Sequence, residues 1–190
     1  MFYTYTMHEP SKDTMPYGEL PINEEVRLRQ LDISDADVLF NLVDQNREYL
    51  RHWLPWVDHT QTTSDSEAFI IENLRKRREG STYGYAIIFE GKLVGHISLM
   101  HITGGKDPEI GYWISSDVSG RGIVKLAAGV LTKFGLNTLG LDKIVIKAEP
   151  DNIASNKIAE KLGYEPKGIE NSEHTGRPVN IWVKLFDRAA

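Results

Sequence analysis

The stretch SSDVSGRGIVKLAAGVL, from Ser115 to Leu131, places Gly120 and Gly122 on either side of an arginine, directly before an apolar run. Glycine is costly inside a helix and useful just before one. Apolar residues then recur at the spacing of a helix that turns one face to the core. They are Ile123, Leu126, Ala127, Val130, Leu131 and Phe134. The stretch therefore predicts a loop leading into a helix that begins near Gly122.

Such a helix start is suited to binding an anion. The first turn of a helix carries unpaired N–H groups and a partial positive charge, and phosphate is its typical ligand. Gly120 and Gly122 remove the Cβ atoms that would keep an anion away, while Arg121 and Lys125 add positive charge. An ordinary strand-to-helix turn is the alternative interpretation, because a short G-x-G pattern is weak by itself. The stretch matches neither a Walker loop nor a Rossmann fingerprint.

The flanking sequence alternates strands and helices. Two strands, turning at Glu90-Gly91, are predicted within 83–102, and Ser64 with Glu67 resembles a capping box before the helix that Gly80 ends. The other predicted strands are 26–31, 109–114, 143–148 and 181–186, with a helix at 152–162 and a hairpin between Tyr164 and Ile181. The pattern predicts an α/β (α+β) protein with a mixed sheet covered by helices. We divide the chain into an N-terminal arm, 1–23, and one domain, 24–190.

Composition excludes several classes of function. The net charge of −5 argues against non-specific nucleic-acid binding. No apolar run is long enough to span a membrane, and the N-terminus does not resemble a secretory signal, so a cytoplasmic location is expected. The chain has no cysteine, which excludes disulfides, thiolate metal sites and a cysteine nucleophile. His96 and His101 are five residues apart on a predicted strand, so they face opposite sides, and no metal site is expected.

Two segments together carry a family resemblance. EIGYWISSDVSGRGIV, from Glu109, and AEPDNIASNKIAEKLGYEPKG, from Ala148, resemble the GNAT superfamily of acyl-CoA N-acyltransferases. The chain is most similar to the branch of bacterial ribosomal-protein N-terminal (serine/alanine) acetyltransferases. This resemblance implies a single domain with about seven strands, splayed between the fourth and fifth. It also implies acetyl-CoA as co-substrate, no metal, and a primary amine as acceptor. A homodimer is the default assembly.

The resemblance assigns the cofactor site. In the family, the loop before the helix binds the pyrophosphate of acetyl-CoA through backbone amides, with the pattern Q/R-x-x-G-x-G/A. Ser119 stands where Gln or Arg is usual, Gly122 matches, and Val124 replaces the last small residue, where its branched side chain would crowd the phosphate. The pantetheine arm is expected along the backbone of the 109–114 strand and at the amide of the Asn that opens the next helix. The expected cofactor-binding residues are Trp113, Ile114, Ser119, Gly120, Arg121, Gly122, Ile123, Val124, Asn152 and Ser155.

Acetyl transfer to an amine needs a base for the amine and an acid for the leaving thiolate. Glu109 is the first candidate base and Glu173, in a loop beside His174, is its rival. Each could equally be an ordinary surface charge. Many superfamily members use a Tyr as the acid, but its position here is Ala159. The resembling branch has a Ser at the position of Ser155, so we expect its hydroxyl to act as the acid or as a hydrogen-bond donor to the thiolate.

Trp53 and Trp56, which bracket Leu54-Pro55, are the candidate residues for binding the acceptor. We expect an apolar wall for the acceptor there, with simple burial as the alternative. The leading hypothesis is acetylation of a protein N-terminal α-amine, such as that of a ribosomal protein. The alternatives are a small-molecule amine acetyltransferase acting on a polyamine, amino acid or drug, a non-catalytic acyl-CoA-binding module, and a plain nucleotide-phosphate binder.

Overall fold

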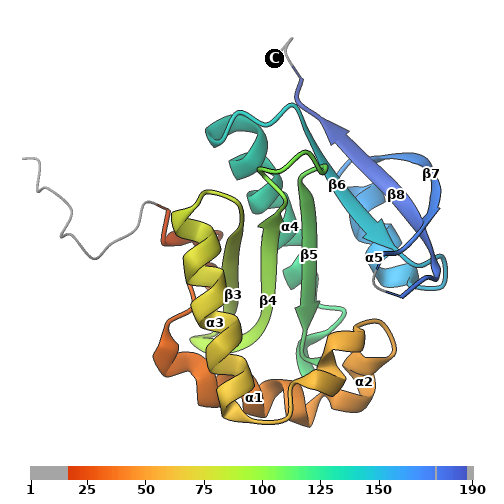
Figure 1. Ribbon diagram of the computed structural model, residues 1–190. Helices are drawn as coiled ribbons and strands as arrows, with labels where there is room; N and C mark the ends of the chain where they lie inside the picture. The colour runs from red at the N-terminus through yellow and green to blue at the C-terminus, as the bar shows by residue number, and fades with distance from the viewer. Residues whose placement is uncertain (1–16, 174, 188–190) are drawn as a thin grey trace, which may run out of the picture.

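A computed structural model describes residues 17–173 and 175–187, and its centre is one mixed sheet (Figure 1). The eight strands lie in the order β1-β2-β3-β4-β5-β6-β8-β7, and every pairing is antiparallel except β5 with β6. The strands are β1 (Glu19–Pro21), β2 (Val26–Arg29), β3 (Tyr83–Phe89), β4 (Lys92–Met100), β5 (Glu109–Ile114), β6 (Lys143–Ala148), β7 (Glu165–Asn171) and β8 (Pro178–Leu185). The strand beyond the expected seven is β1, which comes from the segment assigned to the arm; the arm's residues 1–16 lie outside the described residues.

Helices cover both faces of the sheet (Figure 1). Buried residues of α1 and α3 form one apolar cluster with β3, and those of α4 form a second cluster with β3, β4 and β6. The helices are α1 (Ala36–Gln45), α2 (Arg47–Arg51), α3 (Thr63–Arg78), α4 (Ile123–Lys133) and α5 (Ile153–Lys161). Shorter turns are η1 (Ile33–Asp35), η2 (Pro55–His59), η3 (Ser116–Val118) and the π-helical η4 (Phe134–Thr138). No helix within the described residues is long and apolar enough to cross a membrane.

The start of α3 differs from the expected one. Thr62, not Ser64, is the N-cap: its side chain accepts a hydrogen bond from the backbone of Asp65, whose carboxylate accepts one from the N–H of Thr62. The capping box is therefore formed by Thr62 and Asp65, two residues before the expected Ser64 and Glu67. The two patterns overlap in the sequence, and either could open a helix.

The face that α4 buries is also rotated from the predicted one. Leu126, expected in the core, is 39% exposed, whereas Val124 is buried within the apolar cluster beneath α4. The side chain of Val124 therefore points toward the sheet and away from the open end of the helix. This burial argues against the expectation that Val124 crowds a phosphate.

The sheet divides between β5 and β6. These parallel strands share one residue pair, Glu109 with Val145, whereas β5 pairs with β4, and β6 with β8, along their full lengths. Beyond Glu109 the two strands separate (Figure 1). Because a strand without a partner leaves N–H and C=O groups free, the edge of β5 that faces β6 can accept an added extended chain. This is the expected splay between the fourth and fifth strands, counted from Val26.

Candidate active site

The open end of α4 follows β5 directly. Gly122 is the N-cap, in the left-handed conformation with φ of 79°, and no side chain caps the helix. Gly120 has the same φ, and a Cβ added to either glycine would meet no atom within 4 Å. Glycine is required here by the positive φ, and the space in front of it is open. The first-turn N–H groups therefore face a space in which an anion can be bound.

The side chains near this helix start differ in their exposure and in their contacts. Arg121 is exposed, with its guanidinium 5.8 Å from the centroid of the Phe89 ring. The hydroxyl of Ser119 lies 3.3 Å from that of Tyr49 on α2. The side chain of Ile123 is buried, so only its backbone is available at the helix start. Of the residues expected to bind phosphate, Ser119 through Ile123 lie together at the helix start.

Asn46, between α1 and α2, fixes the loop that leads to this helix. Its Oδ1 accepts hydrogen bonds from the backbone N–H of Ser116 at 2.9 Å, the Ser116 hydroxyl at 2.8 Å and the Ser115 hydroxyl at 3.3 Å. Its Nδ2 donates to the carbonyl of Leu42. Asn46 is 5% exposed, so these bonds are shielded from water and stronger for it. Sequence reasoning missed this residue.

The backbone of β5 presents alternate residues to the gap. Ser115 donates its N–H to Val94, and Trp113 pairs with His96, so the N–H and C=O of Trp113 point toward β4. The groups of the intervening residues, Tyr112 and Ile114, point toward β6. Ile114 therefore has the orientation expected of a pantetheine partner, and Trp113 does not; Tyr112 was not anticipated.

Tyr112 also makes the central side-chain contact of the site. Its hydroxyl lies 2.8 Å from the Oγ of Ser155, in the first turn of α5. Burial raises the pKa of Tyr112 to about 12, with the hydrogen bond to Ser155 opposing the shift. The phenol is therefore protonated at neutral pH and able to donate a proton. Because side chains alternate between the two faces along a strand, the sequence of 109–114 already indicates that Tyr112 and Glu109 face opposite sides of the sheet.

Asn152 positions Ser155. Its Oδ1 accepts a hydrogen bond from the N–H of Ser155 at 3.1 Å and so caps α5. Within 17–173 and 175–187, no group accepts a hydrogen bond from the Nδ2 of Asn152. Capping therefore uses one end of the amide and leaves the donor end for a ligand, so both functions considered from the sequence are compatible.

The two candidate bases have different surroundings. Glu109 lies where β5 and β6 meet, with a 22% exposed side chain 3.5 Å from the Nζ of Lys147, which also lies 2.7 Å from Glu170. Burial lowers the pKa of Lys147, but the hydrogen bond to Glu170 and the charge of Glu109 outweigh it and raise that pKa. Glu173 is 71% exposed and paired with Lys106. Only Glu109 lies at the junction of the divided strands. His174, the expected assistant of Glu173, lies outside the described residues.

The two tryptophans of the expected acceptor wall are placed differently. Trp56, on η2, is 38% exposed, and its ring lies 6.1 Å from that of the buried Trp113. Trp53 is half-buried and packs edge-on against the ring of His52 at 4.3 Å. Trp56 therefore presents an aromatic surface beside β5, while Trp53 packs edge-on within its own turn.

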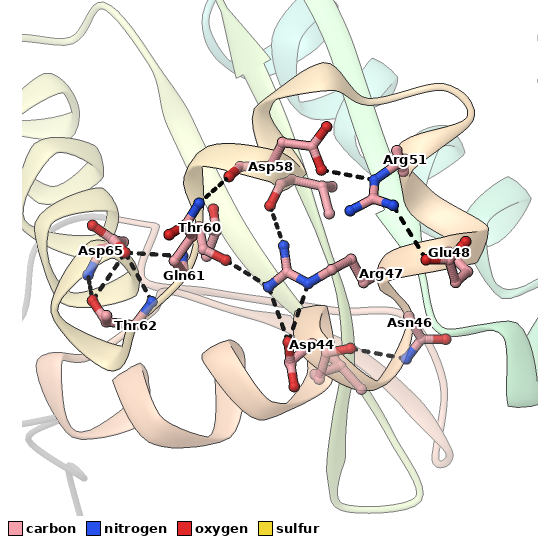
Figure 2. A network of polar contacts seen from close by, with 12 residues as sticks. Asp44, Asn46, Arg47, Glu48, Arg51, Asp58, Thr60, Gln61, Thr62 and Asp65 are labelled. Carbon is pink, nitrogen blue, oxygen red and sulfur yellow. Dashed lines mark hydrogen bonds and ion pairs between the residues drawn. The ribbon is translucent and has the colours of Figure 1, made fainter.

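Figure 2 shows how η2 is held in place. The guanidinium of Arg47 donates to the carbonyl of Val57 within η2, to that of Thr60 just after it, and to the carboxylate of Asp44. Arg51 pairs with Asp58 at 2.7 Å. These bonds join α2 to the segment that carries Trp56. Among the described residues no group of His, Asp or Glu is arranged to hold a metal ion.

The gap between β5 and β6 and the open start of α4 lie next to each other and form the candidate site. The model of the acetyltransferase (GNAT) domain matches residues 25–165, and the chain belongs to this family. The ribosomal-protein-serine acetyltransferase of Escherichia coli K12 is 26% identical over 173 residues, covering 88% of this chain and 97% of that protein.

Solved structures show the same fold. The microcin C7 self-immunity acetyltransferase MccE, in complex with acetyl-CoA and AMP, is 26% identical with a TM-score of 0.83, covering 90% of this chain and 97% of that chain. RimL, a ribosomal L7/L12 alpha-N-protein acetyltransferase in complex with coenzyme A, also has a TM-score of 0.83, at 24% identity. This match covers 89% of this chain and 98% of that chain.

Proposed function

We propose that the protein transfers the acetyl group of acetyl-CoA to the N-terminal α-amine of a protein, with ribosomal proteins as the leading acceptor class. Membership of the GNAT acetyltransferase family supports the reaction type. The names of the Escherichia coli relative and of RimL support the acceptor, and the acetyl-CoA complex of MccE supports the co-substrate. A cytoplasmic location, where ribosomal proteins are made, is part of this proposal.

The residues present fit acetyl-CoA. Gly120 and Gly122 leave room for a pyrophosphate at the start of α4, and Arg121 supplies a nearby positive charge. The free edge of β5 offers the backbone groups of Tyr112 and Ile114 to the pantetheine amides. Acetyl-CoA supplies an activated acetyl group. The chain's residues hold its two ends so that this group lies near Glu109.

Two protons must move. An α-amine has a pKa of about 7.7–8.0, so a carboxylate can remove its proton near neutral pH, directly or through water. We assign this step to Glu109. The leaving thiolate needs a proton, which we assign to the Tyr112 hydroxyl, assisted by Ser155 at 2.8 Å. Ser155 is thus a hydrogen-bond partner of the acid, and Glu173 is not required.

One observation carries the proposal: β5 and β6 pair only at Glu109 and Val145 and then separate beside the uncapped start of α4. The testing experiment measures acetyl-CoA consumption against peptides beginning with Ser, Ala or Met, and against spermidine, free lysine and an aminoglycoside. Released thiol is read directly, because the protein has no cysteine of its own. Turnover on peptide α-amines is expected. Turnover only on a small amine, or acetyl-CoA binding without turnover, would replace the proposed acceptor or the proposed activity.

A further inference from the structure

A cavity of about 220 Å³ lies on the sheet face that carries α3, between that helix and β4. Phe69, Asn73 and Lys76 line it from α3, and His96, Ser98 and Met100 line it from β4. The proposed site and its assigned residues do not use this cavity. It is large enough for one side chain of a bound molecule.

His96 marks the cavity as a ligand site. It is 5% exposed, and its Nε2 is buried without a hydrogen-bond partner among the described residues. Burial lowers the pKa of His96 to about 4, so the ring is neutral at physiological pH. A buried polar atom without a partner is costly, and such atoms are rare in folded proteins. A ligand in the cavity would satisfy it.

The lining favours an anionic or acceptor-rich group. None of the ten lining residues is Asp or Glu, and Lys76 provides a positive charge. Its ion pair with Glu72 is half-exposed and 3.5 Å long, so it competes weakly with a ligand. The Ser98 side chain adds a hydroxyl on a residue that is 7% exposed. A carboxylate can accept hydrogen bonds from the ammonium of Lys76, from an N–H of the neutral His96 ring and from the Ser98 hydroxyl.

The cavity lies one strand away from the proposed base. Met100 is paired with Glu109, and Ser98 with Gly111, so these four residues share one face of the sheet. Gly111 has no side chain, and the Met100 methyl group lies 3.0 Å from where its Cβ would be. Apart from atoms of the two chain neighbours, the Met100 methyl group is the one atom found within 4 Å of that position among the described residues, and it belongs to a flexible side chain. Adjacent strands are about 4.8 Å apart, and an extended peptide rises about 3.3 Å per residue. The cavity is therefore within reach of the second or third residue of a peptide that begins at Glu109.

We propose that this cavity binds an acidic side chain at the second or third residue of the acceptor peptide, whose α-amine lies at Glu109. The inference rests on the proposed function and adds a sequence preference to it. Lys76 supplies the charge that recognises the carboxylate, Ser98 and His96 supply hydrogen bonds, and Met100 moves aside as the peptide crosses β5.

The test compares peptides that differ only at positions 2 and 3, which carry glutamate, glutamine or lysine. For the wild-type protein we expect the lowest KM for glutamate, about tenfold below that for lysine, as a charged hydrogen bond provides. Lys76→Gln should raise the KM of the glutamate peptide about tenfold and leave the KM of acetyl-CoA unchanged. Arg78→Gln removes the same charge from an exposed position on the same helix and should change neither value. Ser98→Ala should raise only the peptide KM.

Equal KM values for the three peptides, or equal effects of Lys76→Gln and Arg78→Gln, would overturn the proposal. Binding of the N-acetylated glutamate peptide, measured by calorimetry in the presence of CoA, separates the two hypotheses. If no peptide is turned over but the blocked peptide binds the wild-type protein tenfold more tightly than Lys76→Gln, the cavity stands and the proposed reaction fails. If peptides are turned over without regard to charge, the reaction stands and the cavity assignment fails.

Discussion

The hydroxyl of Tyr112 lies 2.8 Å from the Oγ of Ser155, joining the part of β5 that no longer pairs with β6 to the first turn of α5. The two residues are 43 positions apart in the sequence. This contact holds the buried, protonated hydroxyl of Tyr112 beside the gap between β5 and β6, where the proposed reaction occurs.

Replacing Tyr112 with Phe removes only this hydroxyl. We expect kcat to fall about 100-fold, the lower range for loss of a general acid, with acetyl-CoA affinity within twofold of wild type. The measurement is steady-state kinetics with calorimetric binding of acetyl-CoA. Tyr164→Phe is the matched control, because its hydroxyl, buried against Thr132 at 2.7 Å, belongs to the core beneath α4. Similar losses of kcat in the two variants would contradict the assignment.

Glu109→Gln tests the proposed base. We expect kcat for a peptide acceptor to fall about 100-fold at pH 7 and by much less above pH 9, where the α-amine is already neutral. A pH–rate profile from 6 to 9.5 measures this convergence. Glu173→Gln, which alters an exposed carboxylate, should follow the wild-type profile. A constant ratio of Glu109→Gln to wild type across the pH range would exclude Glu109 as the base.

Gly122→Asp places a carboxylate at the start of α4. We expect acetyl-CoA binding to be lost, since the charge repels the pyrophosphate. The same substitution at Gly140, which also has a positive φ, at 69°, and open space around its Cβ position, controls for the backbone cost of a residue in this conformation. Calorimetry with acetyl-CoA and thermal unfolding of both variants provide the readouts. Unchanged affinity in Gly122→Asp would remove the phosphate site from this loop.

His96 predicts a pH dependence of stability. Because burial lowers its folded pKa to about 4, the unfolded chain binds a proton more readily as the pH falls below about 6.5. This contribution to stability is therefore present above pH 6.5 and is lost as the pH falls toward 4. Relative to His96→Gln, the wild-type protein should lose about 2–3 kcal/mol of unfolding free energy between pH 7 and 4.5. Urea denaturation at both pH values checks this, and a pH-independent difference would refute it.

Local patterns were sufficient for much of the fold. The strand at 109–114 and the helix start near Gly122 were predicted at their observed bounds, because alternation and a glycine before an apolar run are short-range signals. The rotation of α4 that buries Val124 and exposes Leu126 could not be predicted, since each residue turns the helix by about 100° and several faces were apolar.

The site required tertiary structure. Tyr112 could be placed on one face of its strand from the sequence, but its partner Ser155 could not be identified. The hydrogen bonds of Asn46 to the Ser115-Ser116 segment likewise join residues about 70 positions apart. The family resemblance supplied the loop at Ser119–Gly122 and Asn152. It supplied no information on which backbone groups of β5 face the gap, and Trp113 was chosen where Tyr112 is oriented correctly.

One short segment, residues 46–51, contacts both halves of the proposed site. Asn46 binds the loop before α4, and Arg47, the next residue, binds the turn that carries Trp56. A substrate that fixes the position of this segment from one side would also fix it for the substrate on the other side. We therefore expect acetyl-CoA and the acceptor to raise each other's affinity, and linkage requires the factor to be the same for both, whichever binds first.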